Sequence, residues 1–173
     1  MKYSMTSAEA AKLLKKLNEQ KNMLLGEERR SCVFNASLGE DIESVRPEYD
    51  YDKTQSALCA CNDEIMLVKH AINCFNATQI VGDTGLTIDQ VLVRIPQLTE
   101  MSNRLDAMQG RLSKQRSSVG GIGSNTVIDY KYANYSIDKA KEDFVAVSDE
   151  LRALQTALDI VNTTIKMEFE LPD

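Results

Sequence analysis

The chain has 173 residues, of which 43% are apolar and 27% are charged, a composition that excludes a collagen, a mucin and a disordered tail. A chain of this length buries roughly two-thirds of its unfolded surface in one core, so we expect a single domain over 1–173 that needs no metal or disulfide. Because 26 acidic residues outnumber 20 basic ones, the net charge is −6, which disfavours binding to a nucleic-acid duplex.

The N-terminal residues lack the apolar stretch of an export signal. No later window approaches the roughly 18 uninterrupted apolar residues of a membrane span. We therefore expect a cytoplasmic protein without a membrane span. Its four cysteines are then expected to be reduced thiols: Cys32, Cys59, Cys61 and Cys74.

Four segments have helical periodicity, and each begins at a capping residue. The first covers about 7–30, where Thr6 and Glu9 have the spacing of a capping box. The second covers about 52–76 and begins near Asp52; its apolar residues recur at alternating steps of three and four, as in a coiled-coil seam. The third covers about 88–115 and opens with Thr87 as cap and Gln90 three residues on. The fourth covers about 136–162 and has the most regular seam: Ile137, Ala140, Phe144, Val147, Leu151, Leu154, Leu158 and Val161.

The similar lengths of the last three helices favour antiparallel packing side by side. We therefore predict an all-α fold, an antiparallel, coiled-coil-like bundle of about four helices with a small β addition. Two stretches alternate like short strands, at about 126–132 and 163–170. They pair with each other or across a protomer boundary. The connections 31–51 and 117–125 are predicted to be mobile loops.

Few residues suit catalysis, because His70 is the sole histidine. We therefore expect neither an enzyme nor a cofactor. His70 and Cys74 share a helix face and have the spacing of two ligands to a metal held between protomers, although the plainer interpretation is a rim histidine beside small apolar thiols. The glycine-rich stretch 117–124 lacks the lysine and the strand-to-helix setting of a phosphate loop. The connection 31–51, which is rich in acidic residues, lacks the ligand spacing of a calcium loop.

Three motifs are similar to those of a known family: Ile72-Asn73-Cys74-Phe75-Asn76-Ala77-Thr78, the stretch Gly85 to Arg94, and Asn162-Thr163-Thr164. Over nearly its whole length the chain resembles the septicolysin-like family of small helical bacterial proteins, although it lacks the tryptophan that the family places beside the final Asn. The family takes its name from a reported cytolysin, so the resemblance implies a membrane-active alternative. The residues themselves supply no basic amphipathic surface for it.

The same motifs place polar side chains at a helix–loop–helix corner. Asn73 and Asn76 end the second helix, Thr87 begins the third, and Arg94 is expected to reach back to these amides or to acidic helix ends. With Asn162 they are the candidate residues for binding a ligand or partner. The plainer interpretation is that they clamp the corner.

The regular seams of the second and fourth helices favour association between chains. The predicted function is accordingly that of a non-enzymatic, self-associating helical protein, a homo-oligomer that binds a partner protein. Two alternatives stay open: a binder of a small anionic ligand or nucleotide with its site between protomers, and the cytolysin-like activity implied by the family name.

Overall fold

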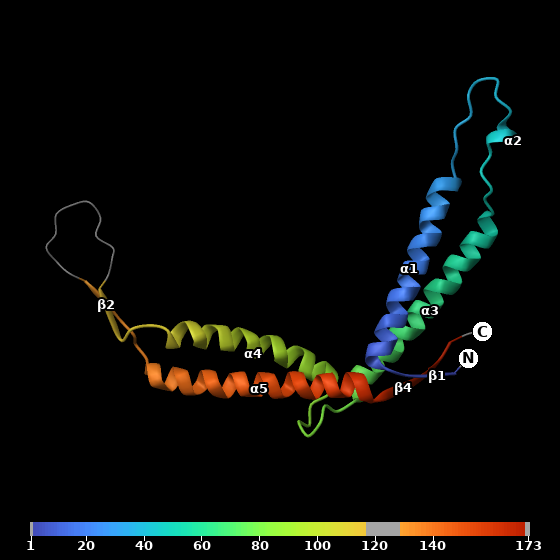
Figure 1. Ribbon diagram of the computed structural model, residues 1–173. Helices are drawn as coiled ribbons and strands as arrows, with labels where there is room; N and C mark the ends of the chain where they lie inside the picture. The colour runs from blue at the N-terminus through green and yellow to red at the C-terminus, as the bar shows by residue number, and fades with distance from the viewer. Residues whose placement is uncertain (1, 117–128, 172–173) are drawn as a thin grey trace, which may run out of the picture. The chain divides into compact units, whose positions relative to one another are not determined.

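The computed structural model describes residues 2–116 and 129–171 and is mostly helical, with two small antiparallel sheets (Figure 1). The described chain divides into two compact units, whereas the composition predicts one domain. Unit 1 comprises Met1–Gln79 and Ile160–Asp173, and unit 2 comprises Ile80–Asp159. We describe each unit separately.

Unit 1 is built on two long helices that lie side by side, α1 (Ser7–Ser31) and α3 (Tyr51–Thr78). The capping box predicted at the start of α1 is confirmed: Thr6 accepts from the Glu9 backbone N–H, and Glu9 accepts from the Thr6 N–H. The cap of α3 is Asp50 rather than Asp52, because the Asp50 carboxylate accepts the Lys53 N–H at 3.0 Å. The second helix therefore begins one residue before the predicted position.

A two-stranded antiparallel sheet completes unit 1. It pairs β1 (Lys2–Thr6) with β4 (Lys166–Glu170), and Tyr3 lies opposite Phe169 with their rings stacked at 5.8 Å. Since α5 continues to Thr164, the strand begins three residues later than the predicted 163. The core of unit 1 joins both helices to the residue that follows β4, with Tyr3 and Phe169 of the sheet packed against it; its buried members are Leu17, Cys61, Ile65, Val68 and Leu171.

Unit 2 contains α4 (Ile88–Gln109) and most of α5 (Ile137–Thr164), which lie side by side in Figure 1. The capping box of Thr87 and Gln90 is confirmed. Buried residues recur every seven positions on both helices, at Val91, Leu98 and Leu105 and at Ala140, Val147 and Leu154. This spacing is that of a narrow seam between two helices.

The predicted third helix is too long at its C-terminal end. It stops at Gln109, with Gly110 as its C-cap, and Lys114–Arg116 forms a short strand, β2, instead of the final helical turn. This strand pairs antiparallel with β3 (Tyr130–Tyr132), and Lys114 lies over the Tyr130 ring at 4.1 Å from its centre. The charged ammonium and the ring face attract each other, which favours the strand pairing.

Both strand-like stretches therefore have partners within the chain, and neither pairs with the other. β4 pairs with the N-terminal segment, and β3 pairs with the residues that follow α4. The predicted stretch 126–132 is a strand from Tyr130, and its residues 126–128 lie outside the described residues. The glycine-rich segment 117–125 also lies outside them.

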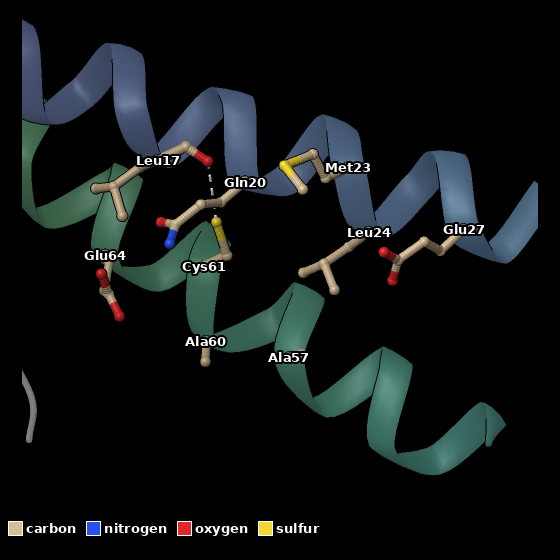
Figure 2. A pocket seen from close by; sticks show the side chains of 9 residues that line it. All are labelled: Leu17, Gln20, Met23, Leu24, Glu27, Ala57, Ala60, Cys61 and Glu64. Atoms are coloured by element: carbon tan, nitrogen blue, oxygen red, sulfur yellow. Dashed lines mark hydrogen bonds between the residues drawn. The ribbon is translucent and has the colours of Figure 1, made fainter. Parts of the chain in front are cut away.

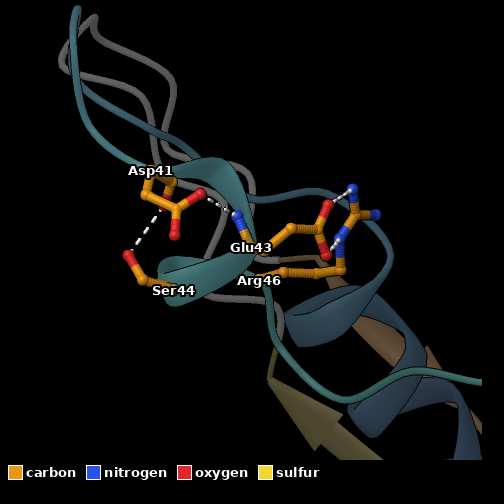
Figure 3. Close-up of polar contacts among 4 residues, drawn as sticks. All are labelled: Asp41, Glu43, Ser44 and Arg46. Atoms are coloured by element: carbon orange, nitrogen blue, oxygen red, sulfur yellow. Dashed lines mark hydrogen bonds and ion pairs between the residues drawn. The ribbon is translucent and has the colours of Figure 1, made fainter.

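The acidic connection between α1 and α3 contains a short helix, α2 (Ile42–Val45), shown in Figure 3. Asp41 caps it by accepting the Glu43 N–H at 3.2 Å, and Glu43 holds Arg46 through two hydrogen bonds of 3.0 and 2.8 Å. Those bonds lower the pKa of the Glu43 carboxyl below its ordinary value. The connection therefore has local structure where the sequence predicts only a mobile loop.

Candidate functional site

A groove runs between α1 and α3 in unit 1, with a volume of about 410 Å³ (Figure 2). We call it the α1–α3 groove. Figure 2 shows α1 along one side and α3 along the other, with the Cys61 thiol donating to the Leu17 carbonyl at 3.3 Å. Its lining combines apolar or small side chains with three polar ones: Leu17, Gln20, Met23, Leu24, Glu27, Ala57, Ala60, Cys61 and Glu64.

The groove lies beside the packed face of the two helices, where α1 contributes few buried side chains. Within α1, Ala10 and Leu17 are the buried residues, and no residue from Asn18 to Ser31 is buried. On α3, Leu58 and Cys61 are buried, whereas Ala57 and Ala60 line the groove to one side of them with methyl groups only. Apolar surface is therefore left open along the hairpin.

The rim of the groove is polar, and two of its three polar residues are acidic, Glu27 and Glu64. Beyond the groove, Glu28 accepts from the Tyr49 hydroxyl at 3.1 Å and from the Gln55 amide at 2.6 Å. Partial burial, followed by the bond to Glu28, raises the pKa of Tyr49. These bonds tie the residues before α3 to the end of α1 and hold the two helix ends together.

A second groove in unit 1, the α3–β4 groove, has a volume of about 460 Å³. It brings His70 and Cys74 of α3 together with strand β4. The Cys74 sulfur lies 3.5 Å from His70 Nε2, and Glu168 and Glu170 also line the groove. In residues 2–116 and 129–171, no cluster of three or more His, Cys, Asp or Glu side chains is arranged to hold a metal ion.

The predicted polar corner is divided between the two units. Asn73, Asn76 and Asn162 belong to unit 1, where Asn73 is exposed and the other two are half-buried. Thr87 and Arg94 belong to unit 2, and the hydroxyl of Thr87 is engaged in its own capping box.

Arg94 pairs with a residue that the sequence does not single out. Its guanidinium donates from Nε and Nη2 to Glu150 Oε1 at 3.0 and 2.7 Å. Glu150 lies in the interior of α5, so the expectation that Arg94 contacts the Asn side chains or an acidic helix end is wrong. The arginine instead joins α4 to α5, beside a hydrogen-bond contact of 3.4 Å between Ser102 and Ser148.

The α1–α3 groove is a site that sequence reasoning missed. Leu17 and Leu24 lie within the predicted first helix, but helical periodicity alone gives no sign that a groove runs beside them. One signal was available: Ala57 and Ala60 are small residues on the second helix, and both line the groove.

No model of a known protein family matches the chain, and no curated protein matches it. A solved structure from Corynebacterium diphtheriae, described as that of a functionally unknown conserved protein, is similar in fold, with a TM-score of 0.56. It is 15% identical and the match covers 95% of this chain and 99% of that one, so the likeness concerns the fold alone. Within the part of the chain that the structure describes, none of the helices has the length and apolarity to cross a membrane.

Proposed function

We propose that this chain is a non-catalytic, self-associating helical protein, in which the α1–α3 groove of one copy is covered by the same face of a second copy. The observation that carries the proposal is the open apolar groove itself. Met23 lies at its edge with 65% of its surface exposed, next to Leu17 and Leu24, so a surface that covers the groove removes this contiguous apolar area from water.

The charges along α1 suit an antiparallel pairing with itself. At 100° per residue, Lys12, Met23 and Glu27 fall within about 60° of one another around the helix, and two of them, Met23 and Glu27, line the groove. If two copies of α1 cross with a two-fold axis between positions 19 and 20, Lys12 of one copy lies opposite Glu27 of the other. The same operation places Glu9 opposite Arg30. Both pairs join opposite charges.

Such a dimer is isologous, because each copy uses the same surface and every contact occurs twice. In this register Met23 lies opposite Lys16 of the other copy, whose methylene stem covers it, and burying the exposed part of one methionine stabilises by about 1 to 2 kcal/mol. The flanking ion pairs are exposed and contribute less, about 0.2 to 1 kcal/mol each, but they fix the antiparallel direction.

The test compares two methionines of similar exposure. Met23 is 65% exposed beside the groove, whereas Met66 is 60% exposed on α3 and is absent from the lining of the groove. Multi-angle light scattering should give twice the 19.3 kDa chain mass for the wild type and for Met66→Lys. Met23→Lys should weaken the dimer at least about 30-fold, because it removes two buried side chains and sets a lysine opposite Lys16.

A charge exchange tests the direction of the pairing. Lys12→Glu and Glu27→Lys should each weaken the dimer, and the double variant should recover most of the lost affinity. A monomeric wild type at micromolar concentration contradicts self-association. If the Met23→Lys variant remains a dimer, the interface between the copies lies outside the groove. The predicted partner protein then becomes the better candidate for occupying the groove.

A further inference from the structure

The α3–β4 groove contains His70, the single histidine of the chain, and this histidine is in contact with a thiol. Cys74 is exposed, and its sulfur lies 3.5 Å from Nε2 of His70, one helical turn earlier on α3. Side chains four residues apart on a helix lie on the same face, so the contact follows from the helix itself. The remaining lining includes apolar side chains from both elements, among them Leu67, Phe75 and Phe169.

The other three cysteines lack this surrounding. Cys59 is exposed on the same helix but precedes His70 by eleven positions, about 16 Å along the axis. Cys32 is exposed and follows α1 as its C-cap. Cys61 is buried and donates to the Leu17 carbonyl. Cys74 is therefore set apart by an adjacent base and an adjacent binding surface.

We propose that Cys74 is a modification site that exchanges with a small disulfide carrying no net negative charge. Nε2 of His70 lies within reach of the thiol proton when the sulfur attacks, and the thiolate is the reactive nucleophile in disulfide exchange. The apolar side chains of the groove accommodate the organic part of the disulfide. This site is independent of the α1–α3 groove and does not rest on self-association.

The reaction is balanced without any further reagent. The Cys74 proton passes to His70 Nε2 as the sulfur attacks one sulfur of the disulfide, whose S–S bond breaks while the Cys74 mixed disulfide forms. The departing thiolate takes the proton from His70 and leaves as a free thiol. Cys74 is oxidised, and the released half of the disulfide is reduced.

The charge preference follows from strand β4. Glu168 and Glu170 both line the groove, and one ammonium group serves both carboxylates: Lys2 bonds Glu168 at 2.8 Å and lies opposite Glu170 in the sheet, which leaves one net negative charge on this strand. A negative charge beside the thiol repels an anionic disulfide and attracts a cationic one. Cystamine should therefore react faster than oxidised glutathione at Cys74.

The experiment measures the rate of mixed-disulfide formation at each cysteine of the reduced full-length chain by peptide mass spectrometry. With cystamine, we expect Cys74 to react about tenfold faster than Cys59, and His70→Gln to remove most of this difference while the rate at Cys59 is unchanged. Glu170→Gln should reduce the preference for cystamine over oxidised glutathione at Cys74 only.

Continued protection of the buried Cys61 reports that each variant is folded. Should His70→Gln disturb that protection, the wild-type comparison of Cys74 with Cys59 still decides the outcome. Equal rates at Cys74 and Cys59 in the wild type overturn the proposal. A folded His70→Gln variant that retains the fast reaction at Cys74 overturns the role of the imidazole.

Discussion

The seam between α4 and α5 predicts a sharp contrast between two leucines on the same helix. Leu98 is 1% exposed and lies in the seam, whereas Leu92 is 47% exposed. Replacing each by Ala leaves the backbone and helix propensity almost unchanged. The difference between the two variants in free energy of unfolding therefore measures the effect of burying the leucine side chain.

The magnitudes follow from the burial of each side chain. Leu to Ala removes three carbons, and at about 0.8 kcal/mol per buried carbon the transfer cost at Leu98 is about 2.4 kcal/mol. The cavity left in the seam raises this to about 3 to 4 kcal/mol. At Leu92 about half of the surface already faces solvent and no cavity forms, so the cost is about 1 kcal/mol.

Urea unfolding followed by circular dichroism gives both values, and the protein concentration is held constant so that any association affects each variant alike. We expect Leu98→Ala to lower the free energy of unfolding by at least about 2 kcal/mol more than Leu92→Ala. A Leu92→Ala variant that is as destabilised as Leu98→Ala would show that the seam does not hold the two helices as the burial indicates.

Four further outcomes are expected. The hydrogen bond from the Thr6 N–H, together with the Thr6 hydroxyl, holds the pKa of Glu9 below its ordinary value. The ionised Glu9 therefore stabilises the folded protein above the pKa that this carboxyl has in the unfolded chain, and the stabilisation is lost as pH falls through its pKa in the folded protein. Glu9→Gln should therefore flatten the decline of melting temperature between pH 6 and about pH 3, and an unchanged decline would contradict this. A double-mutant cycle on Arg94 and Glu150 should give a coupling of about 0.2 to 1 kcal/mol, because both side chains are nearly half exposed; a much larger value would indicate a more deeply shielded pair. Elemental analysis of protein purified without chelator should find no stoichiometric zinc or iron, and one bound metal per chain or per dimer would mean that the two-ligand pair on α3 is completed by another molecule. Anionic liposomes should retain their dye at micromolar protein, because a net charge of −6 gives no electrostatic attraction; release would favour the cytolysin-like alternative.

Helix starts are the features that the sequence determines most directly. The capping boxes at Thr6 and Thr87 each consist of hydrogen bonds between residues three apart, so their outcome depends on a few neighbouring residues. The seam residues of α5 are likewise predictable from the sequence. Helical periodicity places Ala140, Val147 and Leu154 on one face of the helix, independently of what packs against that face.

Tertiary structure decided the features that join distant parts of the chain. β1 alternates Tyr3 and Met5 with polar residues, but a five-residue strand becomes recognisable only with its partner β4 at the other end of the chain. Arg94 meets Glu150 across 56 positions. The α1–α3 groove arises where two small alanines of α3 line the space beside the partly exposed second half of α1. Each of these depends on how elements meet in space, which spacing within one element does not encode.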